Sequence, residues 1–149
     1  MNAITSEKVA YLPGAGKAAE INICLDMYIP DNAALCQMHY PEGMPTVWTG
    51  NPQDFILMPI SGGKPSDAQF SFKDEFLANC SVINLLLATP VPNSWCNKRI
   101  VILGSEYVDR ERQKSFFVTL SVDDSGNLEV GKQMKDDAVS TRSYVLVHK

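Results

Sequence analysis

The sequence lacks any long apolar run. Among its 149 residues, the purely apolar stretches reach only about four or five residues, whereas a helix that spans a membrane needs about 20. The N-terminal stretch MNAITSEKVAYL contains an early acidic residue and no apolar core of signal-peptide length. We therefore expect an unprocessed, cytoplasmic or otherwise intracellular protein that does not bind membranes.

Histidine is scarce, and so are the motifs of enzymes. The chain has two histidines, His39 and His148, and it contains neither a G-x-S-x-G elbow nor an H-E-x-x-H helix. A nucleophile and its base would require one histidine beside a serine or cysteine and a carboxylate, and no spacing indicates such a group. We predict no catalytic residues, so a small β-rich enzyme is the third and least favoured interpretation.

Closely spaced metal ligands are missing as well. No C-x-x-C pair occurs among the four cysteines, and the nearest pair of soft ligands, Cys36 and His39, would face opposite sides of a strand. Structural zinc normally uses two tight ligand pairs. The alternate oxygen ligands of DDSGNLE do not complete a calcium loop, because Leu128 stands where that loop needs glycine. We predict no metal site.

The stretch YLPGAGKAAE resembles a phosphate-binding loop only superficially. Aligning Gly16 and Lys17 with the glycine–lysine pair of that motif places Tyr11 at its first glycine and Ala18 at its hydroxyl position. An alternating, strand-like segment follows instead of a helix. The segment therefore predicts a turn, and we expect no nucleotide or other cofactor.

Charge is unevenly spread along the chain: residues 1–75 hold nine acidic against four basic residues, and residues 76–149 hold eight acidic against nine basic residues. The formal net charge is −4, and the one basic region, residues 98 to 114, has Glu106, Asp109 and Glu111 among its basic residues. These acidic residues would cancel most of the field that attracts a phosphate backbone. We predict no nucleic-acid partner.

Apolar residues alternate with polar ones along most of the chain. Residues 20–29 show this clearly, with Ile21, Ile23, Leu25 and Met27 on one side. Period two is typical of a half-buried strand. Similar segments are separated by Pro, Gly, Asn and Asp, which favour turns. The other predicted strands are 34–40, 54–60, 68–73, 80–88, 99–104, 115–122, 127–130 and 143–148.

About nine short strands predict one all-β domain over residues 1–149, an antiparallel β-sandwich or jelly-roll-like fold. The sharpest local signal is SVDDSGNLEV, a hairpin in which Gly126 can take a positive φ. Helix is expected for one or two short turns at most, in SEYVDRERQK (residues 105–114) and in FKDEFLAN (residues 72–79).

Two apolar segments suggest assembly with another protein chain. The predicted strand 80–88 carries three adjacent leucines, and FILMPI (residues 55–60) is similarly apolar. Such strands are covered on both faces, either by another subunit or by a long loop of the same chain. We predict a non-catalytic interaction or assembly module that self-associates or binds a protein partner. Its predicted interface residues are Phe55, Leu57, Leu85, Leu86 and Leu87.

An alternative function is carbohydrate binding by a lectin-like domain. Trp48 and Trp95 lie in segments rich in Pro, Asn and Gly, and an indole can stack on the apolar face of a sugar while amides and carboxylates bond its hydroxyls. The competing and favoured interpretation is that both indoles fill the ends of the fold, with their N–H groups bonded. The predicted ligand-binding residues are Trp48, Asn51, Asp54, Trp95 and Asn97.

Overall fold

The computed structural model describes residues 9–10, 21–22, 28–39, 51–60 and 62–149. In chain order, its elements are β1 (Val9–Ala10), β2 (Ile21–Asn22), β3 (Ala33–Met38), η2 (Pro52–Asp54), β4 (Phe55–Ile60), α1 (Pro65–Ser71), α2 (Cys80–Leu87), η3 (Asn93–Trp95), β5 (Arg99–Val101), β6 (Ser105–Asp109), β7 (Ser115–Val122), β8 (Leu128–Met134) and β9 (Ser143–His148).

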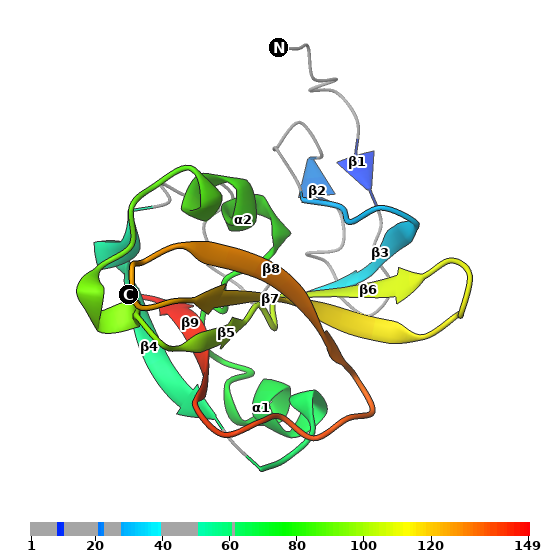
Figure 1. Cartoon of the computed structure of the whole chain (residues 1–149). Helices are drawn as coiled ribbons and strands as arrows, with labels where there is room; N and C mark the ends of the chain where they lie inside the picture. Colours follow the sequence, from blue (N-terminus) through cyan, green and yellow to red (C-terminus); the bar gives the residue numbers. More distant parts are fainter. Residues whose placement is uncertain (1–8, 11–20, 23–27, 40–50, 61) are drawn as a thin grey trace.

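A seven-stranded sheet forms the centre of the molecule (Figure 1). Its strands follow the order β3-β6-β7-β5-β9-β4, and β8 pairs with the other edge of β7. The prediction of a mostly β chain is confirmed. The predicted antiparallel sandwich or jelly roll is not: β5 and β9 run parallel, and the sheet curls into a half-barrel that carries helices.

Several strands lie where alternation predicts them. The segments 115–122 and 143–148 coincide with β7 and β9, and the β7–β8 hairpin is present. Gly126 has a φ of 85° in its turn. Asp123 Oδ1 accepts hydrogen bonds from the N–H groups of Ser125 and Asn127, at 2.8 and 2.9 Å. Turn chemistry therefore sets the register of this hairpin.

The predicted strand 80–88 is wrong, because this segment forms helix α2. Asn79 caps the helix by accepting from the N–H of Ser81 at 2.9 Å. The buried side chains of Val82, Ile83 and Leu86 follow helical spacing. A short apolar run alone does not distinguish a buried strand from a buried helix.

The prediction is also wrong for segments 68–73 and 105–114. Most of the first lies in α1, where Pro65 occupies the first turn and Asp67 Oδ2 accepts from Lys64 N–H at 3.0 Å. The second, expected to form a helical turn, is strand β6 followed by a turn. In that turn, Asp109 Oδ1 accepts from the N–H groups of Glu111 and Arg112.

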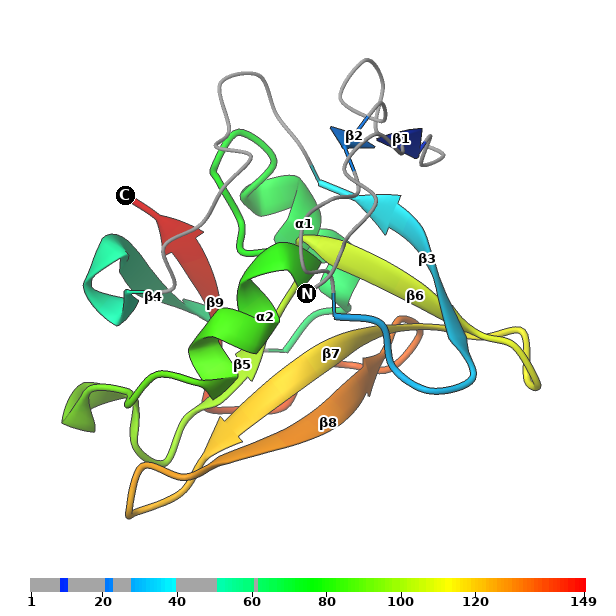
Figure 2. The ribbon, with the colours of Figure 1, turned by 90° about the horizontal axis from the view of Figure 1, so that it is seen from above.

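Both faces of the sheet are covered. On one face, the side chains of α2 pack against Phe116, Val118 and Leu120 of β7. On the other, Phe117 of β7 belongs to a second apolar cluster, against which Ala68 of α1 packs. Helices α1 and α2 therefore lie on opposite sides of the sheet (Figures 1 and 2).

Gly104, between β5 and β6, allows a close backbone contact. Its N–H donates to the carbonyl of Ala78 at 3.0 Å, and its own carbonyl accepts from the N–H of His39 at 2.8 Å. A Cβ at this position would overlap the Ala78 carbonyl. The glycine thus holds three chain segments together at one end of the sheet.

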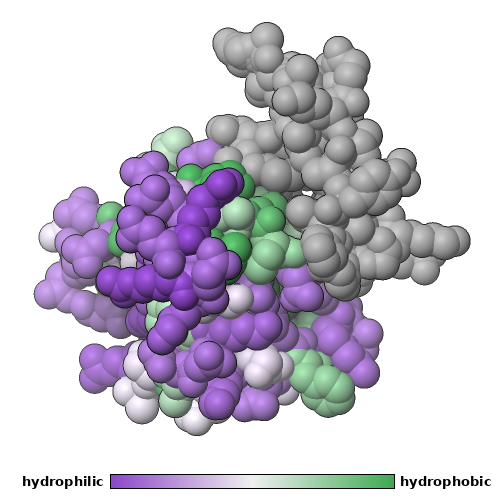
Figure 3. All heavy atoms as spheres, turned by 90° about the vertical axis from the view of Figure 1, so that its right-hand side faces the viewer, coloured by the Kyte–Doolittle hydropathy of each residue, from purple (hydrophilic) through white to green (hydrophobic). Residues whose placement is uncertain are grey.

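The described surface on one side of the molecule is mainly hydrophilic, and its apolar residues form separate small groups, one near the centre and another near the lower edge (Figure 3). Among the described residues, no helix is long and apolar enough to cross a membrane.

Candidate interaction surface

The predicted sugar-binding tryptophans do not form a described site. Trp95, in η3, is 4% exposed and belongs to the same core cluster as Phe55 and Leu86. Its ring is therefore not presented to a ligand in solution, which agrees with the favoured interpretation that it fills an end of the fold. Trp48 lies outside the described residues.

The polar residues of that prediction lie in two different segments. Asn51 is exposed and accepts from Gln53 N–H at 3.0 Å as the cap of η2, where Asp54 is half-buried. Asn97 is exposed, has a φ of 63°, and donates its N–H to Val122 O at 2.8 Å. All three therefore have local structural roles, and sugar binding by them stays a prediction.

The structure brings several predicted interface residues together inside the protein. Phe55 and Leu86 are buried in one core cluster, and the half-buried Leu57 packs against it. Leu85 and Leu87 remain 37% and 38% exposed on α2. Three of the five predicted interface side chains therefore contribute to the core, and the predicted interface stays a prediction.

On β4, the exposed apolar side chains are those that alternate with Phe55 and Leu57 along the strand. Ile56 and Met58 are 44% and 37% exposed. They share a strand face with Ile60, because alternate side chains point to the same side. Ile60 packs against the apolar cluster on the α1 side of the sheet. Ile56, Met58 and Ile60 therefore form a row, here called the β4 row.

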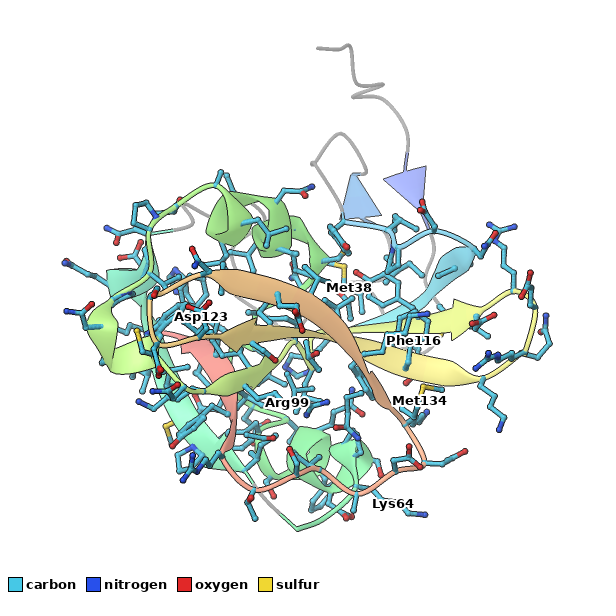
Figure 4. The ribbon with its side chains drawn as sticks, viewed as in Figure 1. Met38, Lys64, Arg99, Phe116, Asp123 and Met134 are labelled. Atoms are coloured by element: carbon cyan, nitrogen blue, oxygen red, sulfur yellow. The ribbon has the colours of Figure 1, made fainter. Side chains whose placement is uncertain are left out.

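A hollow of about 420 Å³ lies between β4 and α1, next to Ile60. Its apolar lining comes from Pro59, Ile60, Ala68, Phe72 and Val139, and its polar lining from Gly63, Lys64, Asp67 and Ser71. Figure 4 shows Lys64 at this end of the molecule. A volume of this size suits a large side chain or a small ligand.

Phe70 is the most exposed large apolar residue that the structure describes. Its exposed fraction is 71%, and it lies on α1, the helix that forms one wall of the hollow. The ammonium of Lys73 lies 4.8 Å from its ring centroid. Burial of such a ring is worth about 1.5–3 kcal/mol, so Phe70 can contribute that much to a contact that covers it.

Neither Phe70 nor the β4 row was a predicted site. The pattern Gly-Gly-Lys-Pro-Ser-Asp contains the start signals of a helix, with proline in the first turn and aspartate at its third position. These signals would have identified α1 and placed Phe70 and Phe72 on different sides of it. Alternation in FILMPI would have separated Ile56 and Met58 from Phe55 and Leu57.

A second cluster, Cys36, Glu106 and Lys135, is polar. Cys36 occupies the bulge in the β3–β6 pairing, and its thiol donates to the Glu106 carbonyl oxygen at 3.3 Å. Glu106 is 5% exposed and lies 3.0 Å from the ammonium of Lys135. The buried carboxylate is therefore paired, as such groups usually are.

This polar cluster is not arranged for nucleophilic chemistry. Burial, followed by the negative charge of Glu106, raises the pKa of the Cys36 thiol to about 11. The thiol is thus protonated near neutral pH, whereas a cysteine nucleophile needs the thiolate. His39 lines a nearby pocket of about 140 Å³ with Glu106. Its Nε2 lies 2.8 Å from Glu75 O and must donate there.

The described residues contain no group of three or more His, Cys, Asp or Glu side chains that could hold a metal ion. Comparison of the chain with protein families, with curated proteins and with solved structures found no significant match.

Proposed function

We propose that this protein is a non-catalytic interaction module that self-associates through the face formed by α1 and β4. One observation carries the proposal: Phe70 is 71% exposed on the same helix that lines an open hollow of about 420 Å³. Phe70 lies on a different side of α1 from Phe72, which lines the hollow, so the exposed ring and the hollow occupy different flanks of one helix and can serve as the two halves of a contact between copies.

A two-fold dimer would use both halves at once. In a two-fold interface, when residue i of one copy contacts residue j of the other, residue j of the first copy also contacts residue i of the second. Phe70 of one copy would enter the hollow of the other, where Ala68 and Phe72 supply an apolar lining. The β4 row lies on the same side of the sheet and extends this apolar surface.

Backbone pairing between two β4 strands contributes little to this dimer. Lys149 N–H donates to Asp54 O at 2.9 Å, and antiparallel hydrogen-bonded pairs alternate along the strands. The backbone groups of Phe55, Leu57 and Pro59 therefore point away from β9. The Phe55 N–H donates to Pro52 O, and proline has no N–H. Side chains must supply the contact.

The expected dimer is weak. Burial of two Phe70 rings contributes about 3–6 kcal/mol, against which stands the entropic cost of association. The mass in solution should therefore rise with concentration. Light scattering on a sizing column, from micromolar to several hundred micromolar protein, measures this directly.

Two variants test the two halves separately. Phe70→Ser removes the ring, and Ser71→Tyr adds bulk at an exposed position that lines the hollow. Each should yield a monomer at every concentration. Leu87→Ser, which changes an exposed apolar residue of α2, is the matched control and should dimerise like the wild type. A wild-type monomer throughout, or a dimer unaffected by both variants, would contradict the proposal.

A further inference from the structure

Strand β8 has a regular outer edge whose N–H donors are open, although its outward carbonyls at Lys132 and Met134 already accept, the first from Arg99 Nη2 at 3.3 Å and the second from Gln133 Nε2 at 3.1 Å. Lys135 N–H donates to Ser115 O, and Asp123 N–H donates to Asn127 O, both at 3.0 Å. Because antiparallel hydrogen-bonded pairs alternate, the backbone groups of Leu128, Val130, Lys132 and Met134 point away from β7. Among the residues that the structure describes, none accepts from these four N–H groups.

The other two edges of the sheet are interrupted. On β4, proline and an internal hydrogen bond remove two of the three outward donors, as described above. On β3, the bulge at Cys36 breaks the period of two, and the N–H of Ala33 donates to Pro30 O at 3.3 Å. Bulges and prolines are the usual protection of an edge strand. Among the described edges, β8 alone keeps four donors in regular spacing.

An apolar groove runs beside this edge. It has a volume of about 180 Å³, a floor of Phe116 and Val118, and a wall formed by Tyr28 and Pro30. On the β8 side, Val130, Gly131 and Lys132 line it, and Val130 is 39% exposed. Figure 4 shows Phe116 and Met134, which pair across β7 and β8, at one end of this region.

Lys132 gives the groove a positive charge. Its ammonium lies 4.5 Å from the Phe116 ring centroid and 4.0 Å from Asp109 Oδ2, and its side chain is 48% exposed. An exposed ion pair at this distance is weak. The lysine is therefore available to a carboxylate that approaches along the edge.

We propose that β8 binds an extended segment of a partner protein as an added strand. The segment carries a large apolar side chain that enters the groove and an acidic side chain that meets Lys132. Backbone hydrogen bonds provide the affinity in this mode of recognition, and alternate side chains provide the specificity. The proposal does not depend on self-association through Phe70.

In the register centred on Gly131, a second copy of β8 fits the edge less well than an acidic segment does. Antiparallel pairing centred on Gly131 would make the two Lys132 side chains diagonal neighbours on one face, because each would lie opposite Val130 of the other copy. Like charges at such positions are unfavourable. A segment with an acidic residue replaces that repulsion with attraction.

The test uses a displayed library of random nine-residue peptides, selected against the full chain. Enriched peptides, synthesised with a fluorescent label, are measured by anisotropy. They should share an acidic and a large apolar residue two positions apart. Binding should weaken more than tenfold for Val130→Pro, which removes an outward N–H, and stay within about threefold for Val130→Thr, which keeps it. Phe70→Ser should bind normally.

Lys132→Gln is a second variant in case Val130→Pro unfolds, which circular dichroism would reveal. It should weaken acidic peptides about threefold to fivefold and leave their Glu→Gln counterparts unchanged. Failure to enrich any peptide overturns the proposal. So does equal binding of the enriched peptides to wild type and folded Val130→Pro, or to wild type and Lys132→Gln.

Discussion

The thiol of Cys36 should react far more slowly than an ordinary cysteine. Its pKa is raised from 9.0 to about 11, first by burial and then by the charge of Glu106. Two pKa units lower the thiolate fraction at pH 8 by about a hundredfold. A more basic thiolate is intrinsically more nucleophilic, which restores about tenfold in exchange with a disulfide reagent. The net expectation is a rate about tenfold below that of a free thiol.

The pH dependence is the sharper measurement, since steric shielding also slows a reaction. The folded protein is treated with dithiodipyridine between pH 7 and pH 11.5, the reaction is quenched with acid, and fragment mass spectra assign the mixed disulfide to Cys36. The rate should rise about tenfold per pH unit up to the raised pKa. A freely exposed thiol should instead reach its plateau near pH 9.

Glu106→Gln separates burial from charge. This substitution removes the carboxylate that accepts from the thiol at 3.6 Å and repels its thiolate. The break in the profile should move below pH 11 and stay above pH 9, because burial, the largest cause, is retained. A wild-type break near pH 9, or a break that does not move in the variant, would refute the reasoning.

Three further predictions concern stability, measured by urea unfolding. Gly104→Ala pushes a methyl group into the backbone carbonyl of Ala78 and should lower the free energy of unfolding by about 2–3 kcal/mol. The control Gly63→Ala meets only the movable carboxylate of Asp67 and should lower it by less than about 1 kcal/mol. Lys135→Met leaves buried Glu106 unpaired and should cost about 2–3 kcal/mol, most of which the double variant with Glu106→Gln recovers. The raised pKa of buried Cys80, about 11, favours the neutral thiol in the folded state, so stability should hold below pH 9 and fall as the pH rises through 11.

Local chemistry explains which elements could be predicted from the sequence. The β7–β8 hairpin depends on neighbouring residues: alternation sets the strands, while Asp123 and Gly126 set the turn. The segment 80–88 has apolar residues on nearly every side, so its period is ambiguous. Asn79, which caps the helix by accepting from the N–H of Ser81, is the local signal that favours a helix here.

Long-range pairing explains most of what could not be predicted. The parallel contact of Arg99 with Ser143 and of Ile100 with Tyr144 joins segments far apart in the chain. No local pattern encodes it, yet it makes the sheet mixed. The exposure of Phe70 could not be predicted from a local pattern either. Whether Phe70 lies inside or outside depends on the helix phase of α1, which alternation had assigned to a strand.

Coverage of both sheet faces restricts how this protein can contact a partner. Among the described residues, α2 and α1 cover much of the two opposite faces, which leaves strand edges, the outer flank of a helix and the exposed β4 row as the surfaces open to a partner. The β8 groove lies on the α2 side, where Leu128 and Met134 pack against the larger core cluster. Phe70 and the hollow lie on the α1 side. The β8 edge presents backbone N–H groups at alternate residues. The α1 side presents the Phe70 ring and the hollow. A single substitution can therefore remove either surface and leave the other unchanged.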